Sequence, residues 1–315
     1  MLQTVSKFES LLFKTQDRHF QEKRDSIEDI YTKFTKAGDA SQADYRSVTS
    51  VGIGMMGLTA QGGMMHLDEY EMGKEWVVSY KKFSTGMLIS EEAIDDMKSN
   101  KRAREDKVKL LQTFATDAAE AAQWTCETQC TDFLIRGTST VVTATWPGVF
   151  RDGLALFSAA HVTQKGAVQW SNLQAGGPPT QLSIQEAVTM LSNIPDETGR
   201  PQANVGGVAI VYGRFNEWRM DEILGTEFAV DVDTNNINPL KNKKITKILD
   251  PYLPPTYPGY MVIDTKWHEL QHFMKKKVTL NTDVDAMTGN RIHRAIMRFA
   301  RSADSAKGII LNSGS

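Results

Sequence analysis

Residues 152–172 read DGLALFSAAHVTQKGAVQWSN. The segment opens on a turn-forming Asp-Gly pair, continues through a short apolar run and ends in polar residues. Ser158 and His161 stand three residues apart in it, so we asked whether they could act as nucleophile and base. No strand-turn-helix elbow of the GxSxG type surrounds the serine, and no acid that would orient the histidine is apparent from the sequence. The sequence therefore predicts a structural role for His161.

A long helix is expected before this segment, because residues 101–134 contain neither glycine nor proline. Small and apolar residues recur there at steps of three and four: Val108, Leu111, Ala115, Ala118, Ala122, Cys126, Cys130 and Phe133. The helix would be about 50 Å long. The stripe is dominated by alanine and lacks the Leu/Ile/Val heptads of a coiled coil, which favours a scaffold helix with two cysteines as small core residues.

The N-terminal part has an apolar stripe of helical spacing, which predicts an amphipathic arm ended by Gly38. The stripe consists of Phe20, Ile27, Ile30, Tyr31 and Phe34. Residues 47–63 are rich in Gly, Met, Ser and Thr and are expected to form a mobile loop. Residues 75–90 mix β-branched and aromatic residues, which predicts extended structure with a bend at Gly86.

The second half of the chain has a mixed α and β pattern. We expect helices at 182–191 and at 215–224, the second ended by Gly225, and a buried strand at 205–212. Five prolines in 238–259 predict turns and extended edges. Residues 277–284 and 292–299 flank a turn-forming segment, 285–290, and are expected to pair as a hairpin. The predicted fold class is α+β.

Composition narrows the class of protein only slightly. The chain has 315 residues, with 36 basic and 38 acidic side chains, and its net charge of -2 provides no global field to attract nucleic acid or an anionic membrane. The N-terminal segment lacks the apolar centre of a secretory signal, and no run approaches the roughly 20 apolar residues of a spanning helix. Two cysteines cannot form a disulfide framework. We therefore expect folding in a cytoplasm.

Residues 268–272 read HELQH, a complete HExxH motif. On a helix, His268 and His272 could bind zinc while Glu269 acts as general base. The sequence argues against this hypothesis, because no glutamate follows Glu269 and the extended motif's glycine and third histidine are replaced by Lys275 and Val278. The possible remaining donors, Asp283, Asp285 and His293, fall in or after the predicted hairpin.

Three weaker motifs lack their supporting context. Gly52, Gly54 and Gly57 form a GxGxxG pattern, but Gly62 and Gly63 follow and no helix opens there, so flexibility is the expected role. Asp283 and Asp285 could begin a calcium loop, but Met287 occupies the next ligand position, which favours a turn. Lys275, Lys276 and Lys277 are expected to form a solvated edge or a local phosphate contact. We predict no catalytic, cofactor-binding or metal-binding residue.

The 152–172 segment resembles the "DG-aliphatic-LFS-x-x-H … SN" block of Mu-type major head proteins of tailed bacteriophages. Other segments resemble parts of the same proteins in the same order, from about Tyr45 onward. They are SYKKFSTGMLISEEAIDDM (79–97), the long helix (101–134), VAIVYGRFNEWRMDEIL (208–224), ILDPYLPP (248–255) and the closing RIHRAIMRFARSADSAKGII (291–310).

This resemblance implies the Hong Kong 97-type capsid fold. Its parts would be an N-terminal arm (1–46), an extended loop (47–90), a peripheral domain built on the spine helix (91–150 and 265–302) and an axial domain (151–264 and 303–315). Such subunits form hexamers and pentamers of an icosahedral phage head around double-stranded DNA. Expected partners are further copies, scaffolding and portal proteins and, non-specifically, the packaged DNA, with no membrane involved. The alternatives are an encapsulin-like compartment that holds protein cargo and an HExxH zinc hydrolase.

Overall fold

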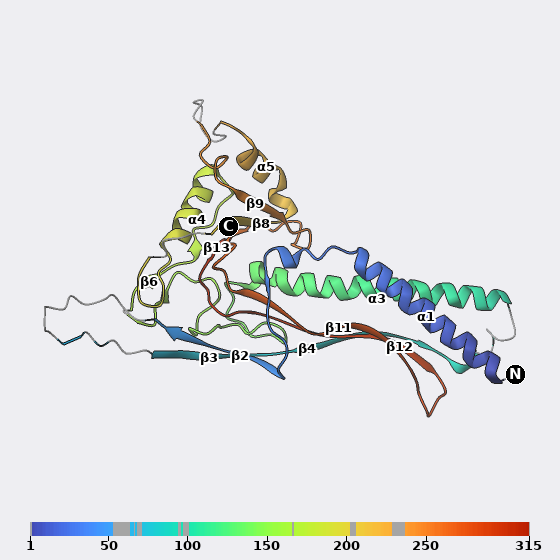
Figure 1. Cartoon of the computed structure of the whole chain (residues 1–315). Coiled ribbons are helices and arrows are strands. Elements are labelled where there is room, and N and C mark those ends of the chain that lie inside the picture. The colour runs from blue at the N-terminus through green and yellow to red at the C-terminus, as the bar shows by residue number, and fades with distance from the viewer. Residues whose placement is uncertain are drawn as a thin grey trace.

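The computed structural model describes residues 2–52, 64–65, 67, 71–93, 96, 101–165, 167–201, 206–228 and 237–314. Helices and strands are both present, as an α+β fold requires. Figure 1 shows an elongated body that contains two long helices and long strands, with a compact part above one end of it and a further pair of strands below that part. The overall shape is therefore far from a sphere.

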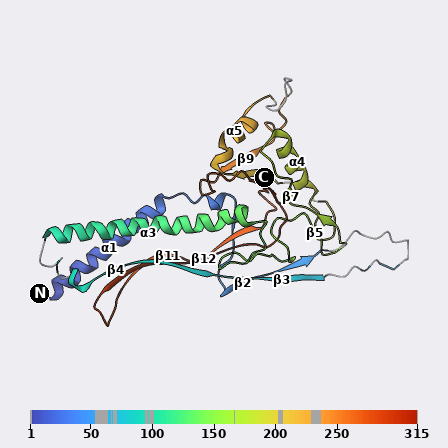
Figure 2. The ribbon, with the colours of Figure 1, turned by 180° about the vertical axis from the view of Figure 1, so that it is seen from behind.

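The long helix predicted from the sequence is present as α3 (Lys101–Arg136). Its 36 residues correspond to a length of about 54 Å. Most of the predicted stripe is buried, from Leu111 and Ala115 to Cys130 and Phe133. Helix α1 (Leu2–Ser26) crosses α3, as Figure 2 shows from behind, and Phe20 is fully buried between them with Ala115, Ala118 and Ala119. Within the described residues, no helix is long and apolar enough to cross a membrane.

The prediction that the N-terminal helix runs to Gly38 is wrong. Helix α1 ends at Ser26, and a single 3-10 turn, η1 (Tyr31–Lys33), follows. Tyr31 and Phe34 are buried as the stripe predicted, but they reach the core from this turn. The turn is held by Glu127 of α3, which accepts the N–H groups of Ile30 at 2.6 Å and Tyr31 at 3.0 Å. This tertiary contact replaces the hydrogen bonds of a continued helix.

A four-stranded sheet lies along α3 in the order β1-β11-β12-β4. Its strands are β1 (Lys36–Ala37), β4 (Lys81–Ile89), β11 (Leu270–Val284) and β12 (Arg291–Ala303). The hairpin of β11 and β12 confirms the predicted pairing, but each strand continues well beyond the predicted segment, so that Leu270 pairs with Ala303. The sheet packs against α3 through residues such as Phe299, Met297 and Ala295.

The expected extended structure at 75–90 is two strands rather than one bent strand. Strand β3 (Glu71–Ser79) pairs with β2 (Asp44–Val51) in a two-stranded antiparallel sheet, and Tyr80 separates β3 from β4. Gly86 lies inside β4 opposite Arg294, where an added Cβ would stand 3.1 Å from the His293 carbonyl oxygen. Gly86 therefore permits close strand approach and does not bend the chain. Of the expected 47–63 loop, residues 47–51 belong to β2, and 53–63 lie outside the described residues.

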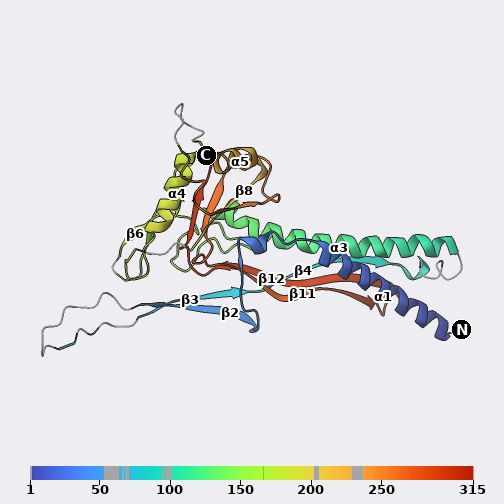
Figure 3. The same cartoon turned by 45° about the horizontal axis from the view of Figure 1, so that its top comes forward.

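The compact part contains a five-stranded sheet in the order β7-β13-β10-β8-β9 (Figure 3). Its strands are β7 (Leu173–Gln174), β8 (Val208–Tyr212), β9 (Ile245–Leu249), β10 (Tyr260–Asp264) and β13 (Ile309–Asn312). Strands β8 and β10 are buried along their whole length. One face of the sheet packs against α4 (Gln181–Asn193) and α5 (Glu217–Gly225), which follows the 3-10 turn η2 (Arg214–Asn216). The expected helices and buried strand are confirmed here.

Candidate functional site

The 152–172 segment begins as a tight turn. Gly153 has φ +83°, and the Asp152 carboxylate accepts the N–H of Leu154 at 3.0 Å. Leu156 and Phe157 then enter the main core. The short strands β5 (His161–Val162) and β6 (Gln169–Trp170) pair with each other and place the Trp170 ring on the His161 ring, with centroids 4.6 Å apart. His161 is thereby fully buried.

Both ring nitrogens of His161 have partners from the same segment. Nδ1 lies 2.5 Å from Asp152 Oδ2, and Nε2 lies 3.1 Å from Asn172 Oδ1. Asn172 Nδ2 donates to the carbonyls of Leu156 at 2.8 Å and Ala306 at 3.0 Å, and Oδ1 also accepts the N–H of Ser158. These bonds fix the orientation of the amide, so Nε2 must donate to Oδ1.

With Nε2 donating to Asn172, Nδ1 faces the Asp152 carboxylate, so both ring nitrogens of His161 are held by side chains of this segment. Burial acts to raise the pKa of Asp152, but the hydrogen bonds from His161 and the Leu154 N–H outweigh it, and this pKa is lowered. Ser158 Oγ accepts the N–H of Ala160. With both nitrogens engaged in this way, His161 is not placed to activate the Ser158 hydroxyl.

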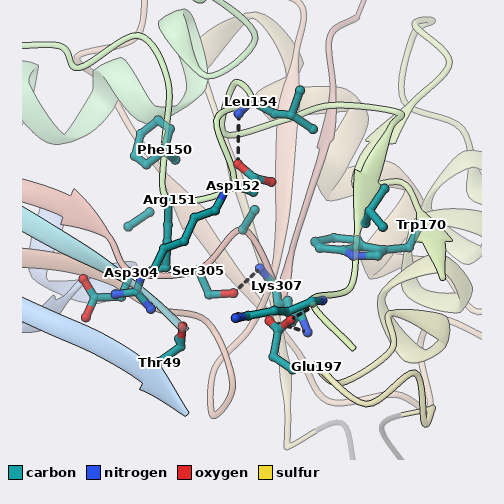
Figure 4. A pocket seen from close by; sticks show the side chains of 15 residues that line it. Thr49, Phe150, Arg151, Asp152, Leu154, Trp170, Glu197, Asp304, Ser305 and Lys307 are labelled. Carbon is teal, nitrogen blue, oxygen red and sulfur yellow. Dashed lines mark hydrogen bonds and ion pairs between the residues drawn. The ribbon is translucent and has the colours of Figure 1, made fainter. Parts of the chain in front are cut away.

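A pocket of about 390 Å³ lies between this segment, Thr49 of β2 and Lys74 of β3, and the turn that follows β12 (Figure 4). Phe150, Leu154 and the Trp170 ring provide apolar wall, and Arg151, Asp304 and Lys307 provide charge. Figure 4 shows Arg151 and Trp170 on opposite sides of the pocket, with Lys307 and Ser305 between them. The lining therefore comes from parts of the chain that are distant in sequence.

Some of the charged groups of the pocket are paired within the chain. Lys307 Nζ lies 2.8 Å from Glu197 Oε1 and 5.9 Å from the centroid of the Trp170 ring. Arg151 Nη2 donates to the carbonyl and the hydroxyl oxygens of Ser47 in β2, at 3.3 and 2.9 Å. Asp304 Oδ2 accepts the hydroxyl of Tyr45, also in β2, at 2.5 Å. These hydrogen bonds of Arg151 and Asp304 hold strand β2 to the main body.

The HExxH residues do not form a helix. His272 lies in β11, and His268 and Glu269 precede that strand. In extended chain, residues four apart are about 13 Å from each other, too far to share one metal ion. His272 Nδ1 contacts the Thr35 hydroxyl at 2.9 Å, and burial lowers the pKa of His268 to about 4. Across the described part of the chain, no three His, Cys, Asp or Glu side chains are grouped as metal ligands.

The remaining motif residues also occupy structural positions. Asp285 accepts the Met287 N–H at 3.0 Å and the Thr288 hydroxyl at 2.7 Å in the hairpin turn, which agrees with the expected turn. Gly52 is described, but Gly54 and Gly57 lie outside the described residues. Cys126 and Cys130 are free thiols buried in the core.

The lysine triplet is not a uniformly solvated edge. Lys275 Nζ donates to the carbonyls of Ala40, Ser41 and Gln42 at 2.7–2.9 Å, so this lysine secures the segment before β2. Lys276 and Lys277 are exposed. The expectation of a solvated edge therefore fails at Lys275.

Sequence reasoning missed the pocket. Its polar residues Arg151, Trp170, Glu197 and Asp304 stand far apart in the chain and match no motif. Only the 152–172 segment indicated that this region is unusual.

Comparison with solved structures identifies the fold. A structure of Mycobacterium phage Adephagia matches with a TM-score of 0.55 and 12% identity, over 91% of this chain and 90% of that chain. The mature capsid of bacteriophage PhiM1 matches with a TM-score of 0.52 and 11% identity, over 91% and 87%. The capsid of a native GTA particle matches with a TM-score of 0.50 and 8% identity, over 91% and 90%. No protein-family model and no curated protein matches the sequence.

The chain therefore has the Hong Kong 97-type fold of tailed-phage major capsid proteins. The expectation drawn from the order of the sequence blocks is confirmed at the level of the fold.

Proposed function

We propose that this protein is the major capsid protein of a tailed bacteriophage or prophage. It self-assembles into the hexamers and pentamers of an icosahedral head that encloses double-stranded DNA. Scaffolding and portal proteins are its further partners during assembly, and it resides in the virion. The role is structural, and no catalytic step is assigned to it.

The observation that carries this proposal is the fold, shared over about nine tenths of the chain with structures that include phage and GTA capsids. Strands β2 and β3 support it as well, because they leave apolar side chains exposed to solvent in the isolated chain. Val48 is 47% exposed, Met72 78% and Val77 44%. Exposed apolar surface of this kind marks an interaction site.

The same proposal divides the subunit into four parts. Residues 1–46 form the N-terminal arm and 47–90 the extended loop. Residues 91–150 and 265–302 form the peripheral domain around α3, and 151–264 and 303–315 form the axial domain. Arm and loop would gain their burial from neighbouring subunits.

Expression of the full chain, alone and with a scaffolding protein, tests the proposal. Sedimentation and electron microscopy should show closed shells with hexameric and pentameric capsomers. A stable monomer at all concentrations, with and without scaffold, contradicts it. Particles purified from an induced host should protect DNA from nuclease; shells that protect only a protein cargo indicate a compartment instead.

A further inference from the structure

We propose that the four-stranded sheet contacts the phosphate backbone of double-stranded DNA with the face that is turned away from α3. The contact is made by Lys82, Arg298 and Lys276, which are called here the basic row. This inference rests on the proposed function, from which it takes packaged DNA as the partner, and it assigns that contact to one surface of the subunit.

The register of three neighbouring strands places the basic row in one line across the sheet. Arg298 of β12 pairs with Lys82 of β4 on one side and with Lys276 of β11 on the other. Side chains of residues that pair across strands lie on the same face, and neighbouring strands are about 4.8 Å apart. The row therefore holds three positive charges within about 10 Å. Lys276 is the member of the 275–277 triplet that is in position for a phosphate contact.

The basic row lies on the face of the sheet opposite the helix layer. Met297 and Phe299, on either side of Arg298 in β12, are buried in the core that also contains Phe133 of α3. Successive side chains of a strand point to opposite faces, so Arg298 points away from α3. Figure 1 shows β4, β11 and β12 on one side of α3. The two lysines of the row are exposed.

The basic row lacks an acidic partner within the described part of the chain, where none of its three side chains forms an ion pair. Farther along the same face, Arg294 is by contrast paired with Asp283. Asp39 and Asp44 belong to the segment that covers Tyr80 at the other end of this face, and neither is paired with the row. Like charges directly opposite each other destabilise a sheet, so an unneutralised row indicates an anionic partner.

The surroundings of the basic row favour DNA over an acidic protein segment. Protein interfaces are centred on aromatic and large apolar side chains and are depleted of lysine. Within the described residues, no large apolar side chain of 81–87 or 276–283 is exposed, and Ser84 and Gly86 follow the row on β4. A DNA duplex needs no apolar anchor, because lysine and arginine bind its phosphates directly.

The salt dependence of DNA binding tests the basic row. The full chain, kept below its assembly concentration, is titrated into a fluorescent duplex of random sequence between about 50 and 200 mM salt. Each phosphate contact contributes about −0.9 to the slope of log K against log salt concentration. Lys82→Gln, Lys276→Gln and Arg298→Gln should therefore each make the slope shallower by about 0.9, and the triple variant by about 2.7.

The matched control removes the same charge elsewhere. Lys243 and Lys244 are exposed residues before β9, so Lys243→Gln/Lys244→Gln changes the net charge as much as Lys82→Gln/Lys276→Gln does. The control should keep the wild-type slope. The urea midpoint of the row variants should not fall, because each substitution removes repulsion between like charges. The double lysine variant remains informative if Arg298→Gln does not fold.

Three results overturn the proposal. The first is the absence of DNA binding at every salt concentration, and the second is an equal slope in the wild-type chain, the row variants and the control. The third is tighter binding of polyglutamate than of the duplex, lost in the row variants, which assigns the row to an acidic protein segment.

Lysine acetylation of assembled heads separates this inference from the proposed function. Lys82 and Lys276 should react less in DNA-filled heads than in heads emptied of DNA, as measured by mass spectrometry. If heads protect DNA while both lysines react equally in the two states, the inference is wrong and the capsid function stands. If the wild-type chain forms no shell, the proposed function fails, and the slopes of the free subunit still decide whether the row binds DNA.

Discussion

Glu127 of the long helix α3 accepts the backbone N–H of Tyr31 at 3.0 Å, and the same carboxylate accepts the N–H of Ile30. This contact fixes the point at which the N-terminal segment leaves α1 and enters the core. Burial raises the pKa of Glu127 to about 7, although the two hydrogen bonds act in the opposite direction.

The first prediction concerns the pH dependence of stability. Because the folded-state pKa of Glu127 lies above its ordinary value of 4.5, its contribution to the unfolding free energy is full below that value and is lost as the pH rises through about 7. The unfolding free energy of the wild-type chain should therefore fall by about 3 kcal/mol between pH 5 and 8. Glu127→Gln should abolish this fall, as measured by urea unfolding of the unassembled subunit. Glu120→Gln, at the exposed pair with Lys23, should leave the profile unchanged.

A second prediction concerns Asn172, whose amide serves four groups. Asn172→Ala leaves the Ser158 N–H, His161 Nε2 and the carbonyls of Leu156 and Ala306 without this partner. We expect the unfolding free energy to fall by on the order of 3 kcal/mol or more. Asn290→Ala removes an exposed contact with the Glu91 N–H and should cost less than about 1 kcal/mol. Equal losses in the two variants would contradict the central position of Asn172.

Alanine substitutions at two glycines with positive φ compare the stability cost of backbone strain alone with the cost of strain together with a steric clash. Gly308 has φ +74°, and an added Cβ would lie 2.7 Å from the backbone N of His268. Gly153 has φ +83° with nothing within 4 Å. Gly153→Ala should therefore cost about 1 kcal/mol and Gly308→Ala at least about twice that, measured by thermal unfolding. Similar costs would show that the structure around Gly308 yields to the methyl group.

The zinc hypothesis makes a separate prediction. Purified protein equilibrated with zinc and then desalted should retain less than stoichiometric metal, because extended chain holds His268 and His272 apart. Glu269→Gln should leave metal content and any background hydrolysis unchanged. Stoichiometric zinc together with an activity lost in Glu269→Gln would falsify the structural interpretation.

Trp218 provides a prediction about assembly. It lies on α5 with 84% of its surface exposed, so it contributes little to the stability of the isolated chain. Trp218→Ser should leave the urea midpoint unchanged and lower the yield of shells, measured by sedimentation. A normal yield would show that this side chain lies outside the subunit contacts.

Much of the fold could be predicted where local pattern and tertiary structure agree. Helix α3 was predicted by the stripe from Leu111 to Phe133 and by the absence of glycine and proline. The hairpin of β11 and β12 was predicted by the turn-forming residues around Asp285 and Gly289. The helical spacing of Ile30 and Phe34 predicted a continued helix that is absent, because the spacing of apolar residues indicates which side chains are buried and not the path of the chain.

Residues fixed by distant partners could not be predicted in the same way. The HELQH motif has helical spacing, yet Leu270 begins a strand because it pairs with Ala303. The roles of Asp152 and Asn172 at His161 depend on the fold of the whole segment. The pocket is still less visible in the sequence, since Arg151 and Asp304 are 153 positions apart and line one cavity only in the folded chain.

The parallel course of α3 and the β11–β12 hairpin has a mechanical consequence. Helix α3 and the β11–β12 strands each extend for about 50 Å and share a packed interface, so together they form one elongated rigid unit, called here the beam. A rotation of about 5° at its base moves the far end by about 4 Å, which is close to one residue of extended chain. A small change in angle where the compact part joins the beam is thus enough to shift the register of contacts at its tip.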